Sequence, residues 1–92
     1  MRAEMTTEQL CRKLNRLLKT KHLDEVLDKF EDRREEVHRD ENGVTEPANW
    51  YAIDGHAVAY LRWHEEFIPV REMGSVPQAA FSAYDEMGIE FN

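Results

Sequence analysis

Residues 49–63, NWYAIDGHAVAYLRW, are the stretch that decides the fold of this 92-residue chain. Asp54-Gly55 lies between two runs rich in aromatic and β-branched residues, which is a strong signal for a two-residue turn. We therefore expect an antiparallel β-hairpin centred on this dipeptide. The predicted cross-strand pairs are Ile53 with His56, Ala52 with Ala57, Tyr51 with Val58, and Trp50 with Ala59.

The alternation of side chains along the two strands predicts two different faces. One face carries Trp50, Ala52, Ala57, Ala59, Leu61 and Trp63. The other carries Tyr51, Ile53, His56, Val58, Tyr60 and Arg62. In a domain this small we expect one face to be fully buried rather than both. A helix over residues 57–68 is the competing interpretation, because Ala57, Leu61, His64 and Ile68 also fit helical spacing.

The first part of the chain has the pattern of two amphipathic helices. Thr6 and Gln9 have the spacing of a capping box, and after them an apolar stripe comprises Leu10, Leu14, Leu17 and Leu18. A second stripe comprises Leu23, Val26, Leu27, Phe30 and Val37. Asn42-Gly43 is placed to end that second helix. Joined by a turn over residues 19–22, the two helices would form a helical hairpin with its leucine faces packed together.

The pattern after this pair predicts a small sheet and one more helix. Pro47 marks a linker, and residues 67–71 can add a third strand that Pro69 confines to an edge. Ser75 can cap a last helix that Gly88 ends. We therefore predict an α+β fold in a single domain, 1–92, with an N-terminal helical hairpin (1–43) followed by a small antiparallel sheet and a C-terminal helix (44–92).

Composition limits the function classes. The net charge is −7 and the chain has a single cysteine, so no disulfide can form within it. Residues 1–22 contain six Lys/Arg and two Asp/Glu, whereas residues 23–47 contain four and ten. An acidic chain disfavours nucleic acid as the default partner. No run approaches the ~20 apolar residues of a membrane span, and no secretory signal precedes Thr6. We expect a cytoplasmic protein without a membrane partner.

The chain shows no pattern that predicts catalysis, a cofactor or a metal. His56 and His64 are eight residues apart, too far to share a metal ion on a helix and on opposite faces of a strand. Cys11 has no nearby base and fits a half-buried structural thiol. Asp40-Glu41-Asn42-Gly43 lacks the spaced ligands of a calcium loop. We therefore expect a non-catalytic protein with no catalytic, cofactor-binding or metal-binding residues.

Two surfaces could serve a binding function. An acidic row on the predicted second helix comprises Asp24, Asp28, Glu31, Asp32 and Glu35. Tyrosine and arginine are enriched at binding hot spots, so Tyr51, Tyr60 and Arg62 are candidate anchors. These features favour a protein-binding module, a small acidic inhibitor that occludes a basic surface of a larger nucleic-acid-handling partner by nucleic-acid mimicry. Its size and charge match those of small acidic inhibitors that come from mobile elements or phages, such as anti-CRISPR and anti-restriction proteins.

The first helix supports an alternative function. Its basic face carries Arg12, Lys13, Arg16 and Lys19. Such a face could contact phosphates, which would make the chain a nucleic-acid-binding accessory protein. A third interpretation is an assembly protein that self-associates through its leucine or tyrosine face. The oligomeric state does not follow from the sequence.

Overall fold

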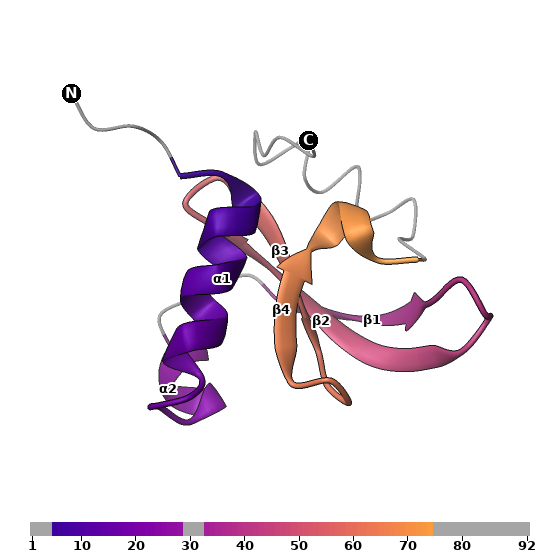
Figure 1. The fold of residues 1–92 in the computed structure, drawn as a ribbon, viewed down its shortest axis with the longest axis horizontal. Helices are drawn as coiled ribbons and strands as arrows, with labels where there is room; N and C mark the ends of the chain where they lie inside the picture. Colours follow the sequence, from indigo (N-terminus) through magenta and orange to yellow (C-terminus); the bar gives the residue numbers. More distant parts are fainter. Residues whose placement is uncertain (1–4, 29–32, 75–92) are drawn as a thin grey trace.

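The computed structural model describes residues 5–28 and 33–74, and Figure 1 shows its architecture. One sheet contains four antiparallel strands in the order β1-β2-β3-β4. The strands are β1 (Arg33–Arg39), β2 (Thr45–Ile53), β3 (His56–Leu61) and β4 (Glu66–Pro69). Two helices precede the sheet, α1 (Thr7–Leu17) and α2 (Leu23–Leu27), and a 3₁₀ helix, η1 (Val70–Glu72), follows it.

The hairpin predicted at Asp54-Gly55 is confirmed with its register. Ile53 pairs with His56, and the ladder continues to Trp50 opposite Ala59. Both turn residues have positive φ angles, 49° at Asp54 and 83° at Gly55, as the tight turns that match strand twist require. The competing helix over residues 57–68 is wrong, because most of that stretch forms β3 and β4.

Helix α1 covers the tyrosine face of the sheet. The predicted capping box is present: the backbone N–H of Gln9 donates to Thr6 Oγ1 at 3.1 Å, and that of Thr6 donates to Gln9 Oε1 at 2.8 Å. The leucine stripe of α1 packs into a core cluster that also holds aromatic residues of the sheet. The buried members of this cluster are Leu10, Cys11, Leu14, Val26, Leu27, Tyr51, Ile53, Val58, Tyr60 and Phe67.

A side chain of α1 also binds the free edge of the sheet. The Asn15 amide donates to the carbonyl oxygen of Phe67 at 3.0 Å, and its Oδ1 accepts from the Phe67 backbone N–H at 2.6 Å. Phe67 lies on the edge strand β4, so both of its outward-facing backbone groups would otherwise lack a strand partner. Asn15 therefore closes this edge and fixes α1 against β4.

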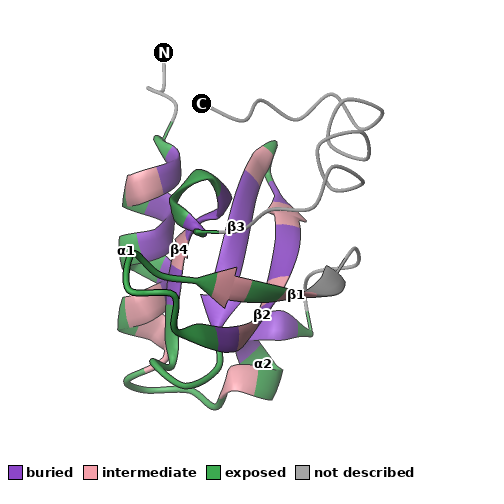
Figure 2. Ribbon diagram, turned by 90° about the vertical axis from the view of Figure 1, so that its right-hand side faces the viewer, coloured by how far each residue is buried: buried purple, intermediate pink, exposed green. Residues whose placement is uncertain are grey.

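The opposite face of the sheet is buried as well. Trp50 is 1% exposed and lies in a second cluster that includes Val70 of η1 and the adjacent Met73. Figure 2 shows buried residues along β3 and the inner part of β2, whereas β1 and the turns are more exposed. The expectation that only one face is fully buried is wrong, because η1 returns across the tryptophan face.

The predicted N-terminal helical hairpin is also wrong. The second helix stops at Leu27, and residues 33–39 form strand β1 rather than its continuation. Between Phe30 and Val37 the chain offers no apolar residue, so a helix there would have nothing to bury. As a strand, the same charged residues pair with β2 and suit a sheet edge.

Two smaller predictions for this region change with it. Asn42-Gly43 belongs to the β1–β2 turn, where Asp40 Oδ1 accepts the backbone N–H groups of Asn42 and Val44, each at 2.9 Å. Pro47 lies within β2 rather than in a linker. Its carbonyl oxygen accepts from the Arg62 N–H at 3.1 Å. Arg62 follows the last residue of β3, so the N–H that proline lacks would face a point where the β2–β3 ladder has already ended.

The expectations for the C-terminal part have mixed outcomes. A strand is present on the predicted edge, but it spans Glu66–Pro69, and the residues after it form η1. The predicted C-terminal helix, from Ser75 to Gly88, lies outside the described residues. Over the described ranges, no helix has the length and apolar character to cross a membrane.

Candidate functional site

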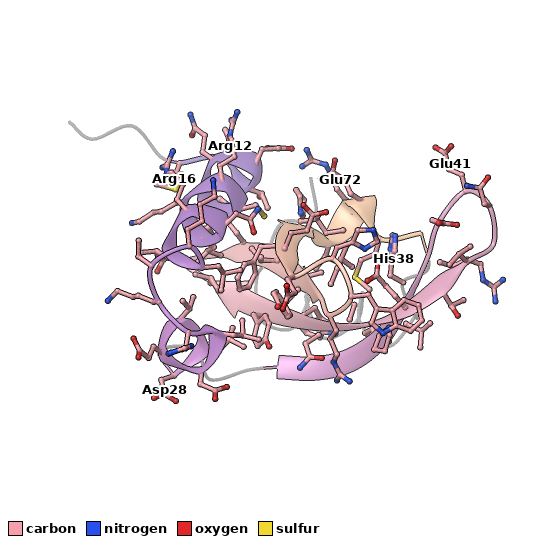
Figure 3. The ribbon with its side chains drawn as sticks, turned by 60° about the horizontal axis from the view of Figure 1, so that its bottom comes forward. Arg12, Arg16, Asp28, His38, Glu41 and Glu72 are labelled. Atoms are coloured by element: carbon pink, nitrogen blue, oxygen red, sulfur yellow. The ribbon has the colours of Figure 1, made fainter. Side chains whose placement is uncertain are left out.

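The acidic row expected on a second helix does not form as a row. Asp24 and Asp28 are exposed, the first within α2 and the second at its C-terminal cap. Glu31 and Asp32 lie outside the described residues, and Glu35 lies in β1. Figure 3 shows Asp28 at the end of the molecule that is remote from His38 and Glu41. The carboxylates were grouped by a helical period that this segment does not follow.

The three predicted anchors lie in different environments. Tyr51 is 0% exposed and Tyr60 is 7% exposed, so both belong to the core beneath α1 and neither can anchor a partner. Arg62 is exposed, and its Nε and Nη2 donate to Asn49 Oδ1 at 3.1 and 2.8 Å. The prediction failed for the tyrosines because α1 covers their face.

Three cations of the predicted basic row, Arg12, Lys13 and Arg16, lie in α1, whereas Lys19 follows the helix, which ends at Leu17. Arg12, Lys13, Arg16 and Lys19 are all exposed. Figure 3 shows Arg12 and Arg16 on the outer side of α1. Within the described ranges these four side chains form no ion pair; the cation of Arg71 pairs with Glu8 at the start of the helix.

A cavity of about 320 Å³ lies at the end of the sheet where the β1–β2 and β3–β4 turns are found, and we call it the hairpin-tip cavity. It is bordered by the β1–β2 and β3–β4 turns, by the ends of the strands that lead into them, and by Glu72 of η1. Its described lining contains four carboxylates, two imidazoles, one hydroxyl and four apolar side chains, and no lysine or arginine. The lining residues are Asp40, Glu46, Glu66, Glu72, His38, His64, Thr45, Val44, Leu61, Trp63 and Ile68.

A buried carboxylate organises this cavity. Glu46 is only 4% exposed, and both of its oxygens have partners. Oε2 accepts from the Trp63 backbone N–H at 3.1 Å, and Oε1 lies 2.5 Å from His64 Nδ1. Because a carboxylate accepts, His64 Nδ1–H is the donor in this contact.

The second imidazole has the opposite arrangement. His38 Nδ1 accepts from the Gly74 backbone N–H at 3.0 Å, so the neutral ring carries its proton on Nε2. Gly74 passes very close to the end of β1: a Cβ added there would lie 1.2 Å from the Arg39 carbonyl oxygen. This close approach explains why glycine occupies that position.

Two large apolar side chains at the cavity are exposed. Trp63 is 66% exposed in the β3–β4 turn, and Val44 is 57% exposed in the β1–β2 turn. Tryptophan is the residue most enriched at binding hot spots, together with tyrosine and arginine. An exposed indole beside a cavity therefore marks this end of the sheet as the strongest candidate for a binding site.

Metal binding and attack by a thiol are two further kinds of chemistry to consider in the described residues, 5–28 and 33–74. Over those ranges, no three His, Cys, Asp or Glu side chains converge as metal ligands. The described cavity lining includes no serine or cysteine nucleophile. Cys11 lies in the core, where burial and, secondarily, the negative charge of Glu72 raise the pKa of its thiol to about 12. Such a thiol stays protonated near neutral pH and is a poor nucleophile.

The sequence does not reveal the cavity, because the cavity depends on the β1–β2 pairing. That pairing places His38 opposite Glu46, whereas a helix over the same residues puts them on unrelated surfaces. One signal was present in the sequence. Trp63 stands among Arg62, His64 and Glu65, a charged context that favours an exposed turn over a buried strand position.

Comparison of this chain with protein families, with characterised proteins and with solved structures finds no match.

Proposed function

We propose that this chain is a non-catalytic binding module that occludes a basic surface of a larger, nucleic-acid-handling protein. The observation that supports the proposal is the hairpin-tip cavity, which combines four carboxylates with the exposed indole of Trp63. Clustered negative charge steers a basic surface toward the cavity, and a large aromatic side chain supplies contact area once the surfaces meet. A protein that handles nucleic acid offers such a basic surface.

This proposal moves the acidic site from the second helix to the end of the sheet. The carboxylates of α2 remain exposed, but they do not border the hairpin-tip cavity. The cytoplasm remains the proposed compartment, since the single cysteine is a buried free thiol rather than part of a disulfide.

The test compares two variants that remove the same charge at different places. The cavity variant combines Asp40→Asn, Glu66→Gln and Glu72→Gln. Its matched control combines Asp24→Asn, Glu25→Gln and Asp28→Asn on α2. Each variant loses three negative charges and retains the shape of the replaced side chains.

Immobilised wild-type protein and both variants are incubated with nuclease-treated lysate of the source cell or its host. The retained proteins are identified by mass spectrometry at low and at high salt. We expect the wild type and the α2 control to retain nucleic-acid-handling proteins at low salt, and the cavity variant to lose them. Equal retention by all three proteins would contradict the proposal.

The basic row of α1 supports a second candidate function. Three exposed cations of α1, together with Lys19 just after it, can contact a phosphate backbone, and the described structure pairs none of them with a carboxylate. Titration against duplex and single-stranded DNA at two salt concentrations tests it. A steep salt dependence that disappears when Arg12, Lys13, Arg16 and Lys19 are changed to Ala would favour this alternative.

A further inference from the structure

The turn that carries Trp63 is held against β2 by several hydrogen bonds. The Arg62 backbone N–H donates to a β2 carbonyl oxygen at 3.1 Å, and that of Trp63 donates to Glu46. The side chain of Arg62 adds two hydrogen bonds to Asn49 of the same strand. A side chain displayed on such a turn loses little conformational freedom when it binds, which favours affinity.

The turn also contains an unfavourable backbone conformation. Glu65 has a φ of 52°, in the left-handed region that residues other than glycine seldom adopt. Its backbone N–H donates to the Leu61 carbonyl oxygen at 2.8 Å, which helps to hold the turn closed. Strain of this kind persists only where the surroundings impose it, and it is concentrated at functional sites.

Most of the polar groups that remain available at the cavity are acceptors, although the Nε2–H of neutral His38 and the Thr45 hydroxyl can donate. Both oxygens of Glu46 are already engaged, so its part is to position the turn and His64. The Oδ2 atom of Asp40 and the exposed carboxylates of Glu66 and Glu72 can accept from a ligand. A ligand that matches this set carries positive charge and several donors, and it can also lie against an indole ring.

From this juxtaposition we infer that the hairpin-tip cavity binds an arginine side chain of the partner, with the guanidinium stacked on Trp63 and hydrogen-bonded to the surrounding carboxylates. The inference rests on the proposed function and names the group that is recognised. A guanidinium has five donors in one plane, is more weakly hydrated than an ammonium and stacks on aromatic faces. Tryptophan gives the strongest cation–π attraction of the aromatic side chains.

Charge complementarity favours an arginine side chain over other occupants of the cavity. Phosphate groups of a nucleic acid would be repelled by the carboxylates. A second copy of this chain is the remaining competitor, because Arg12 and Arg16 of its α1 are exposed. Sedimentation of the full chain across a concentration range tests for this second occupant.

The experiment titrates the full chain with two acetylated, amidated peptides of equal length and charge, one alternating arginine with glycine and the other lysine with glycine. Binding is measured by calorimetry and by the emission of Trp63; Trp50 is the only other tryptophan and is buried. We expect the arginine peptide to bind more tightly. Trp63→Leu should weaken its binding about 3- to 30-fold, the range of a cation–π contact, and should abolish the preference over lysine.

Control variants separate the inference about arginine from the proposed function. Val37→Ala shortens an exposed apolar side chain of β1 that does not line the cavity and should leave both affinities unchanged. The urea midpoint of each variant shows whether it folds. Because Trp63 is exposed, we expect Trp63→Leu to fold. The cavity variant defined above should weaken both peptides at least 10-fold.

The possible results are distinguishable. If Trp63→Leu changes nothing while the cavity variant weakens both peptides, the inference about arginine is wrong and the acidic binding function stands. If neither change has an effect, both are wrong. A dimer that Arg12→Ala with Arg16→Ala dissolves would show that the cavity is occupied by a second copy, and this would also overturn the inference.

Discussion

Replacing Asn15 with alanine should loosen α1 from the sheet, although Asn15 contributes nothing to the leucine stripe. The side chain makes two hydrogen bonds with the Phe67 backbone, at 3.0 and 2.6 Å, in a partly buried position. Each is worth about 1 kcal/mol net, and a buried backbone group left without a partner adds a further penalty. Alanine is a better helix former by about 0.5 kcal/mol. We therefore expect a net loss of about 2–3 kcal/mol in the free energy of unfolding.

Urea denaturation followed by far-UV circular dichroism measures this loss. With an m-value of about 1.5 kcal/mol/M, the midpoint should fall by about 1.3–2 M. Lys13→Ala is the matched control, since Lys13 is exposed on the same helix and an exposed substitution of this kind changes stability by about 0.5 kcal/mol or less.

Asn15→Asp adds a signature that a packing effect would not give. Ionised, the introduced carboxylate can accept from the Phe67 N–H but repels the Phe67 carbonyl oxygen. Protonated, it can donate to that oxygen, so the folded state should raise the pKa of the introduced carboxyl. Its stabilising contribution is then present at low pH and is lost as the pH rises through that pKa. The stability deficit relative to the wild type should therefore be smaller at pH 3.5 than at pH 7.

The reasoning would be refuted if Asn15→Ala cost less than about 0.5 kcal/mol, the level expected of an exposed position, or if the deficit of Asn15→Asp did not change with pH. Either result would mean that α1 is held by its apolar stripe alone and that the edge of β4 needs no partner.

Three further predictions concern the cavity, the core and the end of the described chain. Glu46→Ala should free the β3–β4 turn, lower the fluorescence anisotropy of Trp63 and cost about 2–3 kcal/mol; unchanged anisotropy would contradict the organising role of Glu46. Burial raises the pKa of Cys11 to about 12 and also raises that of Tyr60. The contribution of Cys11 to the free energy of unfolding is therefore complete below pH 9.0, the pKa of its thiol in the unfolded state, and is lost between pH 9 and pH 12. Tyr60 acts in the same direction above pH 10. Urea midpoints that stay constant from pH 8 to pH 11 would refute this prediction. Gly74→Ala should force the chain away from the end of β1, since its Cβ would overlap a carbonyl oxygen. Its loss of stability, about 1–3 kcal/mol, should come with a shifted ring NMR signal of the histidine that the Gly74 N–H contacts.

Local signals in the sequence determined the elements that depend on neighbouring residues. The Asp54-Gly55 turn set both the existence and the register of the β2–β3 hairpin, because positive φ angles at two adjacent positions leave few other turns. The capping box at Thr6 and Gln9 set the start of α1 for a similar reason, since it is completed within one helical turn. Pro69 correctly confined its strand to an edge of the sheet.

Tertiary structure decided the state of residues 33–39. Their charges fit a polar helix face as well as an edge strand, and no turn signal separated the two. Pairing with β2 resolves the ambiguity, because it satisfies backbone groups over seven residues, whereas a helix there would have had no apolar face to bury. Everything that depends on this pairing, including the meeting of His38 with Glu46, was out of reach of a local pattern.

The same division applies to the binding surface. Charge and composition alone pointed to an acidic protein with a separate basic helix, and both features persist in the structure. Which side chains are accessible is a different matter, because accessibility depends on what packs above each face. Helix α1 covers Tyr51 and Tyr60, while the turn ordered by Glu46 leaves Trp63 exposed. Long-range packing, which no short window of sequence encodes, therefore decided which residues form the candidate site.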